Sequence, residues 1–295
     1  MKASTDITIA RGAEPDIDRT AKLYIGGKQT RPDSGYSYTV VTPSGEAVGE
    51  AGLGNRKDIR NAVEAASKAT GWSSATAHNR AQVLYYIAEN FAARSDEFIE
   101  RLKHFGSQTK TAKAEVEMSI QRIFYYAAQA DKYDGRVHST KSRHVTLAMN
   151  EPYGTMGIIC PDESPLLAFV SLVMPAIAMG NRVVIVPSTP YPLSATDFYQ
   201  VLDTSDIPGG VVNIVTGDRA DLAKTLAEHD DVDALWYHGS RQGAEIVEKA
   251  SAGNLKPVWT HAGKSIDWFN ARQSQGAEYL RHATQIKNIW IPYGD

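Results

Sequence analysis

The most regular hydrophobic pattern lies between residues 155 and 260, where short apolar runs alternate with longer amphipathic segments. The runs predict strands at Thr155–Cys160, Arg182–Val186, Val211–Val215, Ala234–Tyr237 and Lys256–Thr260. The segments between them predict helices near 165–179, 191–203, 218–229 and 240–252. Short strands that alternate with helices of this length indicate βαβ units and a parallel sheet covered on both faces. The pattern therefore predicts a doubly wound α/β fold.

The pattern before residue 135 is mainly helical. A strand at 22–28 runs into Gly26-Gly27, which is typical of a hairpin turn. Amphipathic periodicity predicts helices at Ile59–Ala69 with Asp58 as N-cap, at Ala77–Ala93, at Asp96–Lys103 with Ser95 as cap, and from about Ala112 to Lys132. Residues 1–20 are polar and aperiodic, so we interpret them as a tail or linker.

Two further segments favour extended structure. Residues 136–149 predict a hairpin with its turn near Lys141-Ser142. After Lys264 the α/β pattern stops, and 265–275 is polar and irregular. Thr284–Ile291 then alternates polar and apolar residues and predicts one amphipathic strand. Because a lone strand is not stable, it must add to a sheet in this chain or in another one.

Composition narrows the classes of function. The chain has 295 residues and a net charge of −3, which argues against a nucleic-acid partner. Its one cysteine, Cys160, excludes an intramolecular disulfide and a multi-cysteine metal site. The longest apolar stretch, Pro165–Met179, is too short to span a bilayer and is interpreted as a buried helix. No apolar signal core opens the chain, so we expect a cytoplasmic protein without a membrane partner.

Several motifs, in the same order along the chain, resemble the aldehyde dehydrogenase superfamily. They are Leu23–Lys28, Glu151–Ile159, Pro175–Val184, Ile207–Gly217, Gly239-Ser240 and Gly263-Lys264. Collinear matches from about residue 23 to 264 are more specific than any single motif. The resemblance implies a Rossmann-like coenzyme-binding-type domain at 21–135 and 150–264, with an N-terminal helical layer. It also implies an oligomerisation flap at 136–149 and 278–295.

The resemblance also implies that the catalytic residues are lost. In the family, a cysteine thiolate in a separate catalytic domain attacks the aldehyde. Here no cysteine follows Lys264, and the sequence predicts that the catalytic domain is absent. We interpret Cys160 as a small buried apolar residue rather than a nucleophile.

Two further catalytic positions of the family are changed. Glu163 stands where the family has an asparagine that binds the oxyanion, and a carboxylate would repel that charge. Thr260 stands at the position of the general-base glutamate. The neighbouring His261 could serve as a base, but we interpret it as a histidine at the end of a strand. The sequence therefore predicts no catalytic residue.

The cofactor positions are altered in a similar way. The family's Lys-Pro-Ser, whose lysine holds the adenosine ribose, is Val186-Pro187-Ser188 here, and a lost charged hydrogen bond costs about 1.5–3 kcal/mol. The loop from Gly239-Ser240 to Gly243 is one residue shorter than in the family, which alters the helix N-terminus expected at pyrophosphate. The vestigial cofactor-binding positions are Pro187, Ser188, Gly217, Gly239 and Ser240. We expect no bound cofactor, or weak binding of NAD, and no metal.

The flap is the part that the resemblance leaves intact. In the family it extends the catalytic-domain sheet of a neighbouring protomer. The expected interface residues are Val145, Leu147, Ile286, Ile289, Trp290 and Ile291. An exposed apolar strand edge promotes aggregation unless a partner covers it. We expect that partner to be the catalytic domain of an aldehyde dehydrogenase, in the same polypeptide or another chain, or else a second copy in a flap-to-flap homodimer.

The leading functional hypothesis is therefore a pseudoenzyme: a non-catalytic module that docks through its flap on the catalytic domain of an NAD-dependent aldehyde dehydrogenase. The combination resembles the C-terminal half of family 16 aldehyde dehydrogenases, which lacks a catalytic domain and packs on the first half. Alternatives are a residual NAD(P)-binding or sensing domain, part of an aldehyde oxidoreductase, and new chemistry at Glu163, Thr260 and His261. Whether the chain is a stand-alone protein or an excised half stays open.

Overall fold

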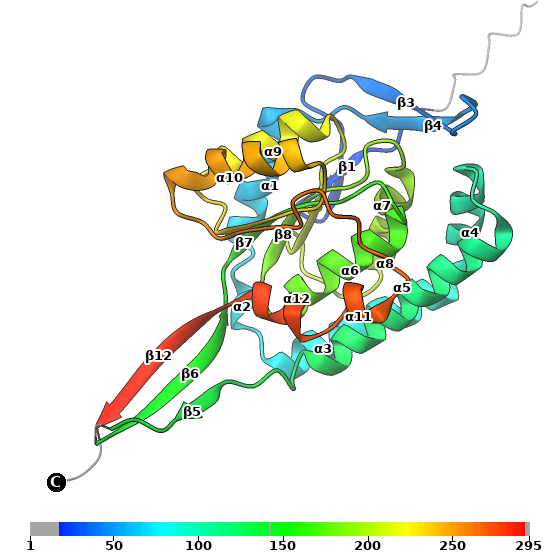
Figure 1. Cartoon of the computed structure of the whole chain (residues 1–295). Helices are drawn as coiled ribbons and strands as arrows, with labels where there is room; N and C mark the ends of the chain where they lie inside the picture. The colour runs from blue at the N-terminus through cyan, green and yellow to red at the C-terminus, as the bar shows by residue number, and fades with distance from the viewer. Residues whose placement is uncertain (1–17, 142, 293–295) are drawn as a thin grey trace, which may run out of the picture.

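A seven-stranded sheet forms the centre of the computed structural model, which describes residues 18–141 and 143–292. Its strand order is β11-β10-β7-β8-β9-β1-β2 (Figure 1). The parallel strands are β7 (Thr155–Ile159), β8 (Arg182–Val186), β9 (Val212–Ile214), β10 (Ala234–Tyr237) and β11 (Val258–Thr260). The predicted α/β fold is confirmed.

Helices cover both faces of this sheet (Figure 1). One face carries α1 (Arg56–Lys68), α9 (Arg219–Glu228) and α10 (Arg241–Ala250), and the other carries α3 (Ala77–Ala93), α5 (Thr109–Gln129) and α6 (Pro165–Ala178). Successive side chains of β8 show why two cores form. Val183 and Ile185 belong to the core on the α6 side, whereas Val184 and Val186 belong to the core on the α9 side. A strand buried on both faces reads as a continuous apolar run.

The remaining elements differ more from the prediction. Residues 191–203 form two short helices, α7 (Leu193–Asp197) and α8 (Tyr199–Asp203), instead of one. The sequence pattern missed the hairpin of β3 (Ser37–Val41) and β4 (Ala47–Gly52). It also missed α2 (Gly71–Ser74) and the 3-10 turn at Ser251–Gly253. The helix α4 (Ser95–His104) was predicted, but it begins at the residue expected to cap it.

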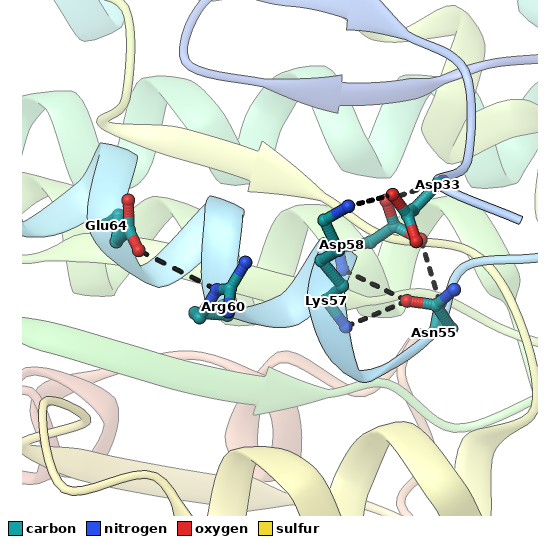
Figure 2. Close-up of polar contacts among 6 residues, drawn as sticks. All are labelled: Asp33, Asn55, Lys57, Asp58, Arg60 and Glu64. Carbon is teal, nitrogen blue, oxygen red and sulfur yellow. Dashed lines mark hydrogen bonds and ion pairs between the residues drawn. The ribbon is translucent and has the colours of Figure 1, made fainter.

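The N-terminus of α1 corrects the expected cap. Asn55 is the N-cap, and its Oδ1 accepts hydrogen bonds from the backbone N–H groups of Lys57 (2.8 Å) and Asp58 (3.3 Å). Asp58 lies three residues on, and its carboxylate accepts from the Asn55 N–H at 2.9 Å (Figure 2). This is a capping box. The prediction of Asp58 as N-cap is therefore wrong by three positions, although its carboxylate does stabilise this helix end.

The N-terminal hairpin was predicted correctly. β1 (Leu23–Ile25) pairs with β2 (Lys28–Thr30), and β1 also pairs antiparallel with β9 at the side of the sheet. Gly26 and Gly27 turn the chain with φ of 64° and 79°, a region that favours glycine. A Cβ on Gly27 would lie 2.8 Å from the Cα of Gly209, so the turn is also closely packed.

Three strands leave the body as an arm, which we call the flap (Figure 1). They are β5 (Arg136–His138), β6 (His144–Pro152) and β12 (Thr284–Pro292), in the order β12-β6-β5. β12 runs antiparallel to β6 in an unbroken register from Thr284↔Pro152 to Pro292↔His144. The predicted hairpin and terminal strand are confirmed, and they join in one sheet. The predicted turn residue Ser142, the start of the N-terminal tail and residues 293–295 lie outside the described residues.

The register shows that the flap has one continuous apolar face. It comprises Val137, Val145, Leu147, Met149, Ile289 and Ile291, and we call it the apolar face of the flap. Ile286 and Trp290 lie on the opposite face, because successive side chains of a strand alternate. The expectation of a simple amphipathic β12 is therefore wrong, since Ile289-Trp290-Ile291 distributes apolar side chains to both faces.

Residues 261–283 join β11 to β12, and we call them the connector. They contain α11 (Ala271–Ser274) and α12 (Ala277–His282), which the polar sequence did not predict. Trp268 and Tyr279 of the connector are buried in the core. Arg122 of α5 is fully buried and donates to the carbonyl oxygens of Trp268 and Ser274 and to two serine hydroxyls. The connector is thus a packed part of the fold.

Within residues 18–141 and 143–292, no helix is both long and apolar enough to cross a membrane.

Candidate functional site

The strand order reverses between β7 and β10. From β7 the chain adds β8 and then β9 on one side, after which β10 and β11 are placed on the other. Ligands of open α/β sheets bind at the carboxyl ends of the strands beside such a switch point. A pocket of about 300 Å³ lies there, and we call it the edge pocket. Its lining residues are Pro161, Asp162, Glu163, Arg219, His238, Gly239, Ser240, His261, Gly263, Lys264, Ser265, Ile266 and Trp268.

An ion pair occupies one wall of the edge pocket. Arg219, the first residue of α9, donates to both carboxylate oxygens of Asp162, with an Nη1–Oδ2 distance of 2.9 Å. The Ser188 hydroxyl donates to the same carboxylate at 2.9 Å and accepts from the Tyr191 N–H at 3.2 Å. Ser188, predicted as a vestigial cofactor position, is thus buried and bonded within the protein, beside buried Pro187. Sequence reasoning missed Arg219 because it belongs to no motif.

Cys160 lies at the end of β7, fully buried and outside the lining of the edge pocket. Burial raises the pKa of its thiol to about 12. The thiolate is the nucleophilic form of cysteine, so a raised pKa disfavours a nucleophilic role for this side chain near neutral pH. These observations agree with the interpretation of Cys160 as a structural residue.

The three residues of the new-chemistry hypothesis do not converge. Glu163 and His261 both line the edge pocket. The hydroxyl of Thr260 instead donates to Glu248 of α10 at 3.1 Å, and Thr260 does not line the pocket. Adjacent strand residues point to opposite faces, so Thr260 and His261 cannot both face the same pocket from an extended strand.

His238 and His261 of the edge pocket belong to a cluster of aromatic and imidazole rings. His238 follows β10 and is 4% exposed, and burial lowers its pKa to about 3. Burial also lowers the pKa of His261. The two rings lie 5.0 Å apart between centroids, and both contact Trp259. His282 of the connector stacks on the same tryptophan at 4.1 Å.

A second cavity, of about 500 Å³, lies between α9 and α10. Ser240 lines both cavities, and its hydroxyl caps α10 by accepting from the Gly243 N–H at 3.1 Å. Gly239 lies just before this cap, where a Cβ would come within 2.6 Å of the Tyr237 hydroxyl oxygen. The Gly217 carbonyl accepts from the Thr189 hydroxyl at 3.2 Å. The predicted glycines thus lie at the carboxyl ends of β9 and β10, as expected for this edge.

Arg241 does not face either cavity as a phosphate ligand would. Its side chain is 81% exposed and pairs with Glu245 one turn along α10, with an Nε–Oε1 distance of 3.4 Å. This supports the interpretation of Arg241 as a solvated surface residue.

Cavities elsewhere do not involve the predicted site residues. One of about 470 Å³ adjoins the N-terminus of α1, where Lys57 is paired with Asp33 and Arg60 with Glu64 (Figure 2). Another, of about 480 Å³, lies at the root of the flap. Among the described residues, no group of three or more histidine, cysteine, aspartate and glutamate side chains converges as a metal site.

Comparison with known proteins identifies the fold. The model of the aldehyde dehydrogenase family matches residues 30–265. The cytosolic 10-formyltetrahydrofolate dehydrogenase of Mus musculus is 31% identical over 82% of this chain and 28% of its own length. The mitochondrial benzaldehyde dehydrogenase of Antirrhinum majus is 34% identical over 82% of this chain and 47% of its own length.

Solved structures of aldehyde dehydrogenases also match this fold. A putative aldehyde dehydrogenase from Burkholderia cenocepacia superposes with a TM-score of 0.79 at 28% identity, covering 81% of this chain and 50% of that protein. The NAD-dependent aldehyde dehydrogenase of Sinorhizobium meliloti superposes with a TM-score of 0.79 at 27% identity, covering 83% of this chain and 50% of that protein. The chain spans half or less of the length of these relatives.

Proposed function

The chain belongs to the aldehyde dehydrogenase family, and we propose that it serves as a non-catalytic docking module. Its flap binds the catalytic domain of an NAD-dependent aldehyde dehydrogenase, in the same polypeptide or in a partner chain. The module contributes a binding surface, and the partner contributes the nucleophile and the general base.

The observation that carries this proposal is the apolar face of the flap. Val137 is 74% exposed on it, and Val145, Met149 and Ile291 are 37%, 43% and 46% exposed. An exposed apolar patch on a projecting sheet marks an interaction site or an aggregation hazard. The family's flap extends the catalytic-domain sheet of a neighbour, so the same surface fits that kind of partner here.

The strand arrangement also suits docking. β12 and β5 are the two outer strands of the flap sheet, so each has one side that β6 does not pair. An outer strand can accept a further strand from a partner sheet, with backbone hydrogen bonds giving affinity and side chains giving specificity. The apolar face then lies against the partner and excludes water from those bonds.

The residues at the sheet edge support a non-catalytic role. Cys160 is buried with a raised thiol pKa, and Glu163 stands at the oxyanion position. Thr260, at the position of the base, is bonded to Glu248. A hydroxyl in that arrangement cannot replace a carboxylate base. We therefore expect no dehydrogenase or esterase turnover from this part of the chain.

Co-expression tests the docking proposal. We expect the full chain to co-purify with an active aldehyde dehydrogenase such as the benzaldehyde dehydrogenase of Antirrhinum majus, and to shift its size in chromatography. The double variant Val145→Asp/Ile291→Asp places two charges at paired positions on the apolar face and should weaken association at least tenfold. Leu255→Asp is the matched control, because Leu255 is 88% exposed on the body.

Each outcome bears on the proposal. Association that the flap variant loses and the control keeps supports it. A homodimer that the flap variant dissociates favours flap-to-flap pairing instead. A stable monomer that ignores active family members at high concentration contradicts both.

A second candidate function is residual binding of NAD(P). The cavity of about 500 Å³ between α9 and α10 favours it, because it adjoins the carboxyl end of β10 and includes Ser240 and Gly243. Calorimetric titration with NAD⁺ and NADP⁺ tests this function. Ala220→Trp should block the cavity from an exposed position. No saturable heat at millimolar cofactor, or equal heat from the blocked variant, removes this candidate.

A further inference from the structure

The hairpin of β5 and β6 carries cations that have no carboxylate partner. Arg136 opens β5, Lys141 and Arg143 lie in the connection to β6, and all three side chains are exposed. None of them forms an ion pair with another residue of the ranges 18–141 and 143–292. The connection lies at the end of the arm, away from the central sheet (Figure 1). We call these three residues the cationic hairpin.

Positive charge is concentrated on the flap, although the chain as a whole is acidic. Residues 136–149 and 284–292 contain four Lys and Arg residues and no Asp or Glu. The whole chain has 31 Lys and Arg and 34 Asp and Glu, so the remainder has 27 against 34 and a net charge of −7. The fourth cation of the flap, Lys287, pairs with Glu151 at an Nζ–Oε1 distance of 3.0 Å. The cationic hairpin is therefore the unpaired part of an arm whose charge is opposite to that of the body.

The cationic hairpin borders the apolar face of the flap. Val137, which follows Arg136 on β5, is 74% exposed on that face. Val145, two residues after Arg143, is 37% exposed on the same face. Protein interfaces commonly have an apolar centre and a polar rim, and arginine is enriched in them. The cations stand where the rim of a docked flap would be.

The root of a second flap matches these cations poorly. Asp131, Asp134 and Glu151 are the acidic residues there. Asp131 is paired with Lys132 at 2.7 Å, and Glu151 is paired with Lys287. Among the described residues, Asp134 is the one carboxylate of the three without an ion pair. One unpaired carboxylate does not balance three cations, so charge favours a different protein over a second flap.

Polyanions also match the cationic hairpin poorly. Segments that bind anionic membranes usually cluster about four to eight Lys and Arg residues. DNA-binding proteins make about six to ten phosphate contacts. The hairpin has three cations, and the acidic body behind it would be repelled by a polyanion. A nucleic acid would also leave the apolar face of the flap uncovered.

On the basis of the docking function proposed above, we propose that the cationic hairpin binds an acidic surface of the protein partner. Carboxylate side chains of that partner stand opposite Arg136, Lys141 and Arg143, beside the area that the apolar face covers. A guanidinium can hold a carboxylate through two parallel hydrogen bonds. Charges at the rim of an interface mainly speed association and exclude partners of the wrong charge. The apolar face then supplies affinity, and the cationic hairpin supplies selectivity.

The kinetics of association with the benzaldehyde dehydrogenase of Antirrhinum majus test the proposal. For the full chain, we expect the association rate constant to fall about tenfold between roughly 50 and 500 mM NaCl, because salt screens the attraction. Lys141→Glu/Arg143→Glu should lower it about tenfold at the lower salt concentration, and the Gln versions should lower it less. Lys110→Glu/Lys113→Glu is the matched control, because it changes the net charge equally at exposed positions of α5 and should have little effect.

Carbodiimide cross-linking locates the contact, because this reagent joins a lysine amine only to a carboxylate that it touches. We expect mass spectrometry to find Lys141 joined to an Asp or Glu of the dehydrogenase, and Lys110 joined to none. Lys141 joined instead to Asp134 of a second copy would overturn the proposal in favour of self-association. Binding to phosphatidylserine vesicles that Lys141→Glu/Arg143→Glu abolishes would overturn it in favour of a membrane.

The remaining outcomes separate this proposal from the docking function. Association that neither salt nor Lys141→Glu/Arg143→Glu changes, with the Tm of that variant unaltered, overturns the acidic contact and leaves docking through the apolar face standing. No association of the unaltered chain at any salt concentration removes the docking function and the acidic contact together.

Discussion

The carboxyl edge of the sheet and the flap differ in how far their side chains are satisfied within the chain. At the edge, Asp162 is bonded by Arg219 and Ser188, and Arg122 ties the connector to the core. On the flap, the apolar face leaves Val137 and Met149 exposed. A carboxylate that is already paired gains little from a ligand, whereas exposed apolar surface gains free energy when it is covered. The difference supports the proposal that association uses the flap.

The largest expected effect is on the rate at which Cys160, at the carboxyl edge of the sheet, is alkylated. Its thiol pKa of about 12 leaves roughly a thousandfold less thiolate at pH 8 than an ordinary cysteine has. We expect iodoacetamide to modify the folded chain at least that much more slowly than the urea-unfolded chain. The rate should rise about tenfold per pH unit well above pH 9. Alkylation is followed by mass spectrometry. Rapid modification of Cys160 in the folded chain at pH 8 would mean that the reagent reaches the carboxyl edge of the sheet.

A substitution of Arg122 tests how much its hydrogen bonds to the connector stabilise the fold. Arg122→Met keeps an apolar stem but removes the guanidinium that donates to the buried Ser171 hydroxyl and to the carbonyl and hydroxyl oxygens of Ser274. We expect the free energy of unfolding to fall by about 3–5 kcal/mol in urea titrations. Arg241→Met, on the exposed surface of α10, should change it by less than about 0.5 kcal/mol. Equal effects of the two variants would mean that the connector is not anchored through Arg122.

A substitution in the turn that starts the connector should have a smaller effect on the free energy of unfolding. Gly263 has φ of 77°, and a Cβ there would lie 2.8 Å from the backbone nitrogen of Arg241. Gly263→Ala should lower the free energy of unfolding by about 1–3 kcal/mol. Gly253→Ala is the matched control, because its Cβ would meet nothing within 4 Å and its φ is not positive. A stabilising Gly263→Ala variant would show that this turn is not held as the structure has it.

The flap should give the smallest effect on stability. Ile291→Asp changes a 46% exposed side chain, so the free energy of unfolding of the isolated chain should shift by less than about 0.5 kcal/mol. The same variant should still weaken association if the apolar face docks. A loss above about 1 kcal/mol in dilute solution would indicate that the face is already packed in the unbound chain.

The parallel sheet could be predicted because its strands are continuous apolar runs. Arg182–Val186 and Ala234–Tyr237 were predicted to the residue, since a strand buried on both faces has no competing helical period. The hairpin of β3 and β4 was missed because Ala47–Gly52 contains two glycines and little β-branched sequence. The two helices of the connector were missed because each is too short to show a period.

For the candidate site, the sequence could predict which residues lie at the edge of the sheet. It could not predict which side chains from distant segments bond to one another there. His261 was expected at the end of a strand and Glu163 at the oxyanion position, and both line the edge pocket. The two partners of Asp162, Ser188 and Arg219, come from separate segments, so no local pattern indicates them. Arg122 was missed because arginine is rarely buried completely, and only its neighbours across the fold explain it. The two-faced character of β12 follows only from its register with β6.

The pairing of β6 with β12 also sets an order of events when the chain folds. Gln285 and Pro152, at the root of this ladder, are 133 residues apart in the sequence. Contacts between such distant segments form slowly, because a long loop must close first. During synthesis β6 emerges with its apolar side chains well before β12 can pair with it. The ladder of the arm can therefore be completed only after β11, the last strand of the central sheet, has been synthesised.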